Sequence, residues 1–342
     1  MKTKFKKCIY MMCFIALFST ALVGCSSKEK AISTDNEVKP EVESPVNEAE
    51  PTKAEDTKAE SNQTEDTRII TTVKGDVEVP ANPQRVVVNW YIGDVFTLGI
   101  KPVAAYAWSH ETMPFYDNFE GVVNIENWDA EEIMSYDPDL IITYSEDDFD
   151  NFSKIAPVIV VPEIDVTSVE RLRFLGEVTG RVAEADAAIA IFEEKLASAK
   201  EELNSDLFKD KTFSILQDWG ASSYGMYYET GSRGGTLVYE YLGLQKPEKL
   251  VQLVEESKQG RGSLSYEVAA DYFGDYVLWF LMEDAESEFA QTDIWNSIPA
   301  VKNGNIIDIP GNMTGLFFYS DVTSLTAQLD YIVNRLVELG DK

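Results

Sequence analysis

The longest regular pattern of apolar residues runs from Arg181 to Leu203. Apolar positions recur there at intervals of three and four, and charged residues fill most positions between them, which is typical of an amphipathic α-helix. The apolar positions are Val182, Ala185, Ile189, Phe192, Leu196, Ala199 and Leu203. Such a helix would be about 35 Å long, since each residue adds about 1.5 Å. The stripe alone fits an ordinary surface helix or a coiled-coil segment, but similar blocks of sequence on both sides favour a rigid connector.

Short apolar runs alternate with short amphipathic segments in both of these blocks. The first predicts strands at 85–88, 102–106, 122–125, 140–144 and 158–161, and helices at 94–98, 130–136, 149–155 and from near 168 to 180. The second predicts strands at 212–216, 276–280 and 305–309, and helices at 236–242, 267–272 and from 322 onward. Alternating strands and helices indicate parallel sheets built from right-handed βα units. We therefore expect an α/β fold with lobes at 68–180 and 206–342, connected by residues 181–205.

The first 24 residues have the pattern of a targeting segment. Four lysines precede an apolar stretch, 9–23, that is too short to span a bilayer comfortably. The stretch ends in Ala21-Leu22-Val23-Gly24-Cys25, which resembles the bacterial lipobox and implies removal of residues 1–24 and lipidation of Cys25. A plain signal peptide and an uncleaved anchor are the alternatives. We expect a protein held by lipid on the outer face of the cell membrane.

The composition of the chain limits the possible structures and binding partners further. Residues 25–67 are polar and contain almost no large apolar side chain, which predicts a disordered stalk. All three cysteines, Cys8, Cys13 and Cys25, lie in or directly after the targeting segment, so the mature body can form no disulfide, thiolate metal site or cysteine nucleophile. The formal net charge of −30 makes nucleic acid an unfavourable partner.

A weak internal repeat relates the two lobes. Glu131 precedes Asp139 by the same separation as Glu267 precedes Asp275, and each pair spans a predicted helix start, a turn and the entry to a buried strand. An acidic residue at a helix N-terminus is often only a favourable partner of the helix dipole. Because a glutamate occurs at the matching place in both lobes, it is equally plausible that Glu131 and Glu267 face outward and contact a partner.

Several segments in order carry a family resemblance. They are the lipobox-like leader and stalk, Val79-Pro80-Ala81-Asn82-Pro83-Gln84-Arg85-Val86-Val87, Glu131 with Asp137-Pro138-Asp139-Leu140-Ile141-Ile142, Lys154-Ile155-Ala156-Pro157, Arg233-Gly234-Gly235 and Asp321 before the closing helix. Together they resemble the iron–siderophore substrate-binding lipoproteins of ABC importers, the last two being similar to the ferric-hydroxamate branch. The resemblance implies two Rossmann-like lobes bridged by a single long α-helix. It also implies a monomeric receptor whose Glu131 and Glu267 pair with arginines of an ABC permease.

A receptor for a ferric siderophore needs neither metal ligands nor a cofactor of its own, because the iron arrives already wrapped in oxygens. It needs aromatic walls and a few donors aimed at those oxygens. The single histidine, His110, also excludes a three-histidine metal site. Sites in such lobes lie beyond the carboxyl ends of the strands. The candidates there are Trp90, Tyr91, Tyr106, Trp108, Trp219, Tyr224, Tyr227 and Arg233, with Phe318 and Tyr319 from the loop before the last helix.

Each of these aromatic residues could equally be part of the core. Arg233 is the more specific candidate, because a guanidinium in a Ser-Arg-Gly-Gly turn suits donation to hydroxamate or carboxylate oxygens, although a surface arginine near a helix is the alternative. The few cations near the expected cleft favour a hydroxamate over a highly charged catecholate complex. Gly231 departs from the hydroxamate relatives, which often have tryptophan two residues before this arginine.

Other functional classes lack the motifs that they require. Residues 146–151 resemble a calcium loop but lack its glycine and its bidentate glutamate. The chain contains no Gly-x-Ser-x-Gly elbow, phosphate loop or dinucleotide fingerprint, so we expect no enzyme. Receptors for cobalamin or haem have the same bilobal build and remain an alternative, as does a surface lipoprotein that binds a macromolecule.

Overall fold

A computed structural model of the chain describes residues 66–163, 166–220, 225–283 and 285–340. The predictions for the targeting segment, for Cys25, for nearly all of the stalk and for Tyr224 lie outside these residues. No helix of the described part is long and apolar enough to cross a membrane.

The predicted parallel sheet of the first lobe is present. Its strands are β3 (Val86–Asn89), β4 (Ala104–Tyr106), β5 (Val123–Asn124), β6 (Leu140–Thr143) and β7 (Val158–Val160), in the order β5-β4-β3-β6-β7 with every neighbouring pair parallel. The connections contain α1 (Ile92–Thr97), α2 (Ala130–Ser135), α3 (Asp147–Phe152) and a 3-10 turn at Tyr116–Phe119. Continuous apolar strands suit this arrangement because helices cover both faces of a parallel sheet.

A second five-stranded sheet follows, and here one expectation was wrong. Its strands are β8 (Phe213–Asp218), β9 (Met226–Glu229), β10 (Arg261–Leu264), β11 (Tyr276–Leu281) and β12 (Ile306–Ile309), in the order β10-β9-β8-β11-β12. β8, β11 and β12 are parallel as expected, but β9 and β10 join antiparallel. The connection from β8 to β9 is short, so the chain can only return antiparallel.

The remaining elements surround these sheets. An antiparallel hairpin of β1 (Thr67–Thr72) and β2 (Gly75–Pro80) was not predicted, and it begins at Thr67, the last residue assigned to the stalk. The second half also contains a π-helix at Thr236–Tyr241, α6 (Glu248–Ser257), α7 (Tyr266–Ala269), α8 (Asp293–Ser297) and α9 (Pro299–Lys302). Short 3-10 turns occur at Ala270–Tyr272, Phe289–Gln291 and Gly311–Met313.

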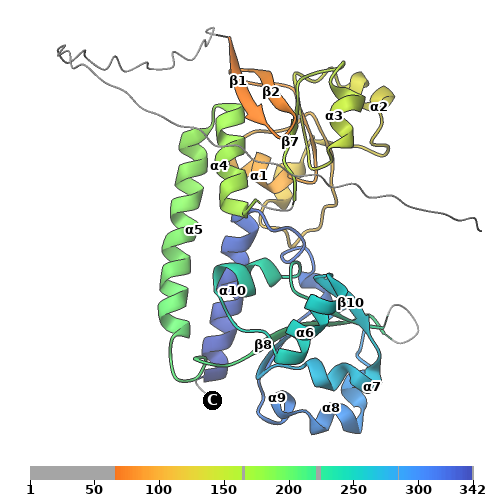
Figure 1. The fold of residues 1–342 in the computed structure, drawn as a ribbon, viewed down its shortest axis with the longest axis vertical. Coiled ribbons are helices and arrows are strands. Elements are labelled where there is room, and N and C mark those ends of the chain that lie inside the picture. The colour runs from red at the N-terminus through yellow and green to blue at the C-terminus, as the bar shows by residue number, and fades with distance from the viewer. Residues whose placement is uncertain (1–65, 164–165, 221–224, 284, 341–342) are drawn as a thin grey trace, which may run out of the picture. The chain divides into compact units, whose positions relative to one another are not determined.

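The long connecting helix is α5 (Val182–Leu203), as its apolar stripe predicted. It follows α4 (Ser168–Thr179), which starts at a capping box of Thr167 and Glu170 and ends at Gly180 in the left-handed conformation. Figure 1 shows α5 beside α4 and then beside the C-terminal helix α10 (Val322–Gly340), and α5 packs on both. α10 also contacts α1 of the first lobe, so more than one helix links the two sheets.

Three apolar clusters form the core of the described residues. Successive residues of a strand point to opposite faces of a sheet, so Val87 and Ile141 belong to a cluster confined to the first lobe, and Leu216 and Tyr228 to one confined to the second. Val86 and Ile215 belong to a third cluster that also includes residues of α4, α5 and α10 and continues through both lobes. The lobes therefore share a core on the side of these helices.

Candidate functional site

Aromatic rings gather where the two lobes meet. Trp90 directly follows β3, and its ring centroid lies 5.7 Å from that of Phe318 and 5.3 Å from that of Tyr319. Trp108, in the loop after β4, lies 4.4 Å from Phe318. Phe318 and Tyr319 belong to the loop before α10, so residues distant in sequence form one aromatic wall across the lobe boundary, as the strand-end rule predicts.

The loop that carries Phe318 is held firmly. The Tyr319 hydroxyl accepts from the Trp108 backbone N–H and donates to the Trp108 carbonyl, each at 3.0 Å. The amide of Gln328, only 1% exposed, donates to the carbonyls of Leu316 and Tyr319 at 2.9 Å. These bonds satisfy buried backbone groups that a loop would otherwise leave unpaired, and they fix Phe318 against the first lobe.

Arg233 approaches this wall from the second lobe. Its guanidinium carbon lies 5.3 Å from the centre of the Phe318 ring, a favourable cation–π contact. Arg233 has φ of 51° and Trp90 has φ of 69°. Residues other than glycine rarely adopt positive φ angles of this size, and residues with such backbone strain cluster at functional sites. One strained, cleft-facing residue therefore comes from each lobe.

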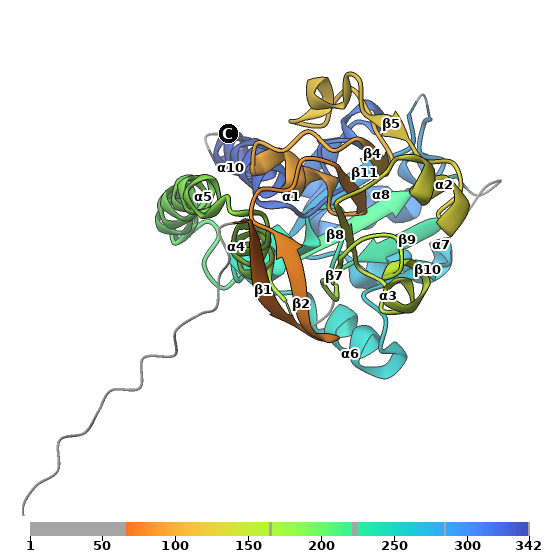
Figure 2. The same cartoon turned by 90° about the horizontal axis from the view of Figure 1, so that it is seen from above.

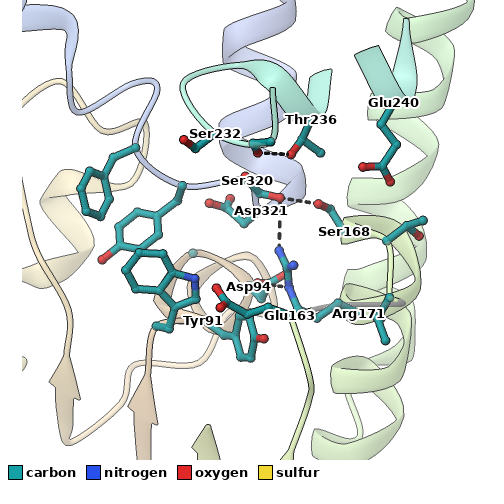
Figure 3. Close-up of a pocket in the computed structure, with 17 residues that line it drawn as sticks. Tyr91, Asp94, Glu163, Ser168, Arg171, Ser232, Thr236, Glu240, Ser320 and Asp321 are labelled. Atoms are coloured by element: carbon teal, nitrogen blue, oxygen red, sulfur yellow. Dashed lines mark hydrogen bonds and ion pairs between the residues drawn. The ribbon is translucent and has the colours of Figure 1, made fainter. Parts of the chain in front are cut away.

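Two cavities flank Phe318, and together they contain seven of the ten predicted ligand residues. A cavity of about 320 Å³ is lined by Trp108, Trp219, Arg233 and Phe318, with His110 and Gln217. A second, of about 220 Å³ (Figure 3), is lined by Trp90, Tyr91, Phe318 and Tyr319, together with charged residues. Phe318 is common to both.

The other predicted residues lie elsewhere. Tyr106 is 43% exposed and its ring contacts Trp128, while Tyr227 lies under the guanidinium of Arg261, 4.8 Å from the ring centre. Neither lines one of the two cavities.

Tyr91 is only 3% exposed, and its hydroxyl donates to the Val161 carbonyl at 2.6 Å, so it forms the floor of its cavity rather than projecting into it.

A charged cluster that the sequence did not reveal lies beneath the second cavity (Figure 3). Arg171 of α4 donates to Asp94 of α1 at 2.8 Å and to the Ser320 carbonyl at 3.2 Å. Asp321, 2% exposed, caps α10 by accepting from the backbone N–H and the hydroxyl of Ser324. Burial raises the pKa of Asp94 to about 6 and also raises the pKa of Asp321, while Arg171 opposes both shifts.

The close approach of α1 to this cluster depends on a glycine. A Cβ added to Gly93 would come within 2.3 Å of Asp321 Cγ, so no larger residue fits there without displacement. The cluster therefore connects α1 and α4 to the loop before α10.

Glu131 and Glu267, the predicted docking residues, are both exposed and lie in the first turns of α2 and α7. α2 and α7 lie on the same side of the molecule in Figures 1 and 2, one in each lobe. The two aspartates of the repeat accept hydrogen bonds from backbone groups instead. Asp139 accepts the backbone N–H groups of Gln84 and Arg85 before β3, and Asp275 accepts that of Thr212 before β8. The repeat therefore reflects equivalent structure in the two lobes.

No group of three or more potential metal-ligating His, Cys, Asp or Glu side chains occurs among the described residues. Two α/β lobes joined by long helices, with an aromatic cleft at their boundary, define a bilobal solute-binding protein.

Comparison with known proteins identifies the family. The model of the periplasmic binding protein family matches residues 89–313, and the chain belongs to this family. It is 29% identical over 286 residues to the iron(3+)-hydroxamate-binding protein YxeB of Bacillus subtilis strain 168, covering 81% of this chain and 87% of that protein. It is 32% identical over 272 residues to FhuD of the same organism, also described as an iron(3+)-hydroxamate-binding protein, covering 77% and 84%. The solved FhuD structure from S. pseudintermedius superposes with a TM-score of 0.67 at 26% identity, covering 79% of this chain and 98% of that one. The family is one of substrate-binding transport proteins, not of enzymes.

Proposed function

We propose that the protein is an extracytoplasmic receptor that binds a ferric siderophore of the hydroxamate class between its lobes and delivers it to an ABC permease. The observation that carries this proposal is the aromatic cleft with Arg233 beside it. Rings contact the organic shell of the complex, and a guanidinium donates to its anionic oxygens. The relatives named above as iron(3+)-hydroxamate-binding proteins support the same ligand class.

Within the cleft, we assign direct ligand contact to Trp90, Trp108, Trp219, Arg233 and Phe318, which line the cavities and are all at least partly exposed. Tyr91 and Tyr319 support these residues from below. Tyr106 and Tyr227 line neither cavity, and we assign them no direct contact. Iron is cargo within the ligand, and the protein needs no cofactor.

Tryptophan fluorescence tests the ligand class directly. A neutral ferric tris-hydroxamate such as ferrichrome should quench the fluorescence saturably and without chemical change, because Trp90, Trp108 and Trp219 line the cleft. Cobalamin and haem serve as comparison ligands of similar size. Absence of saturable quenching by ferric hydroxamates, with either comparison ligand binding, would reject the proposal.

Delivery requires docking to a permease, for which we propose Glu131 and Glu267. Replacing both with glutamine should leave the dissociation constant for the ferric complex unchanged and abolish iron uptake, because both side chains are exposed and line neither cavity. Glu248→Gln, which changes an exposed acid in the first turn of α6, is the matched control and should retain uptake. A double variant with normal uptake would remove these residues from the docking surface.

We further propose that the body is monomeric and is attached to the outer face of the cell membrane through lipid on Cys25, with residues 26–65 as a spacer. The lipobox-like sequence supports this attachment. Labelling with a radioactive or clickable fatty acid tests it, since Cys25→Ala should lose the label.

A further inference from the structure

A buried carboxylate on β9 interacts with two arginines of the second lobe. Glu229 is 1% exposed, and its Oε1 lies 2.8 Å from Nε of Arg261, which is its cross-strand neighbour on β10. Glu229 also acts on Arg233. Burial lowers the pKa of the Arg233 guanidinium, the Glu229 charge opposes that shift, and Arg261 adds to it. The three charged groups therefore form one coupled cluster.

Glu229 also holds the neutral parts of the site. Gln217 Nε2 donates to Glu229 at 2.5 Å, while Gln217 Oε1 accepts from the indole N–H of Trp219 at 3.1 Å. The hydroxyl of Ser232, the residue before Arg233, donates to the other carboxylate oxygen. One carboxylate thus connects to Trp219 and to the turn that carries Arg233. Burial raises the pKa of Glu229, and the hydrogen bonds from Ser232 and Gln217 and the charge of Arg261 oppose that shift.

The cluster lies on the face of the second sheet that carries Gln217, which lines the cavity beside Trp219. Tyr228 points into the apolar cluster confined to that lobe, so its neighbours Tyr227 and Glu229 point to the opposite face. Arg261 is half-exposed, and its guanidinium lies over Tyr227. This wall of the second lobe therefore contains two guanidinium groups, of which Glu229 neutralises one. Glu283, which lines the same cavity as Arg233, adds a carboxylate 3.9 Å from His110.

We propose that Glu229 is a specificity-determining residue, which cancels one of the two guanidinium charges of this wall and thereby selects electrically neutral ferric complexes over strongly anionic ones. Arg261 is the cation whose charge Glu229 cancels. Three hydroxamates carry three negative charges and balance Fe³⁺, whereas three catecholates leave a complex with three negative charges. The inference rests on the proposed function and states how the site chooses within the siderophore class.

The test compares dissociation constants for ferrichrome and for ferric enterobactin, a tris-catecholate complex. In Glu229→Gln, the amide can still accept from Gln217 and donate to the Ser232 oxygen, so the shape is kept while the wall gains one positive charge. The ratio of the two dissociation constants should move by about tenfold toward the catecholate complex, because one added charge acts on three even at a dielectric close to that of water. Arg261→Gln should move the ratio the opposite way.

The double variant Glu229→Gln with Arg261→Gln separates charge from structure. It restores the net charge of the parent protein and should return the ratio to within about threefold of the parent value. Asp308→Asn, an exposed carboxylate on β12 at the opposite edge of the same sheet, is the matched control and should leave the ratio unchanged. If Glu229 only supports the fold, its variant weakens both complexes alike and the double variant does not recover, which would overturn the inference. An unchanged ratio in Glu229→Gln, or no measurable catecholate binding by it, would do the same. Failure of the parent protein to bind either complex rejects the proposed function instead.

Discussion

Two charged clusters in this protein have opposite stoichiometry. At the lobe junction, one arginine, Arg171, faces two buried carboxylates, Asp94 and Asp321. Beside the cleft, one buried carboxylate, Glu229, faces two arginines. The first cluster is largely buried at the base of one cavity and ties α1 and α4 to the loop before α10, whereas the guanidinium of Arg261 in the second remains half-exposed. The cluster with surplus negative charge is thus the more buried of the two, and the cluster with surplus positive charge is the more exposed.

The largest expected effect is on stability. Arg171→Met leaves Asp94 and Asp321 buried without their counter-ion, and removing one partner of a buried ion pair typically costs about 3–5 kcal/mol. Urea denaturation at pH 7 measures the change in the free energy of unfolding. Arg261→Gln removes a half-exposed arginine from the other cluster and leaves the buried Glu229 with its hydrogen bonds from Gln217 and Ser232, so it should cost less than Arg171→Met. Equal losses in the two variants would show that the clusters do not differ as described.

The next effect separates binding from stability. Arg233→Gly removes the guanidinium over Phe318 and should weaken binding of a ferric hydroxamate by more than tenfold, since hydrogen bonds to charged groups contribute about 1.5–3 kcal/mol. The same change should leave the free energy of unfolding unchanged or raise it by up to about 1 kcal/mol, because glycine adopts the φ of 51° without strain. Calorimetric titration and urea denaturation of the same samples provide both values. A large loss of stability with unchanged affinity would make Arg233 a structural residue.

The strands of the first sheet could be predicted from the sequence, whereas the strands at one edge of the second sheet could not. Val86–Asn89 and Leu140–Thr143 are continuous buried strands, and burial on both faces leaves a clear apolar run. β9 and β10 have no such run. Met226–Glu229 contains a charged residue and Arg261–Leu264 a glycine, so each resembles a loop until the other is placed beside it. Whether two strands pair at the antiparallel edge of a sheet depends on tertiary contacts, which the local sequence pattern does not reveal.

The candidate site also contains some residues that the sequence predicts and others that it does not. Trp90, Arg233 and Phe318 could be predicted, since they follow strand ends or belong to a distinctive turn. Arg171 and Glu229 could not, because a charged residue in an amphipathic segment normally faces solvent. Asp94 did carry a signal, because it interrupts the otherwise apolar run of Tyr91, Ile92, Val95 and Phe96. A carboxylate within such a run needs a buried partner, and that requirement could have led to the junction cluster.

The smallest effect is a pH dependence specific to the junction. Asp94 has a pKa of about 6 in the folded protein because of burial, above its ordinary value near 4 in the unfolded chain. A raised pKa means that the folded state binds the proton more tightly, so this group favours folding at low pH and that contribution is lost as the pH rises through about 6. Lowering the pH from 7 to 5 should therefore gain about 1 kcal/mol in the parent relative to Asp94→Asn, in which the titrating group is absent. The difference between the two urea-denaturation profiles isolates Asp94 from other carboxylates. Parallel profiles from pH 7 to 5 would mean that Arg171 fully compensates the burial of Asp94, and the surplus charge of the junction would then reside on Asp321.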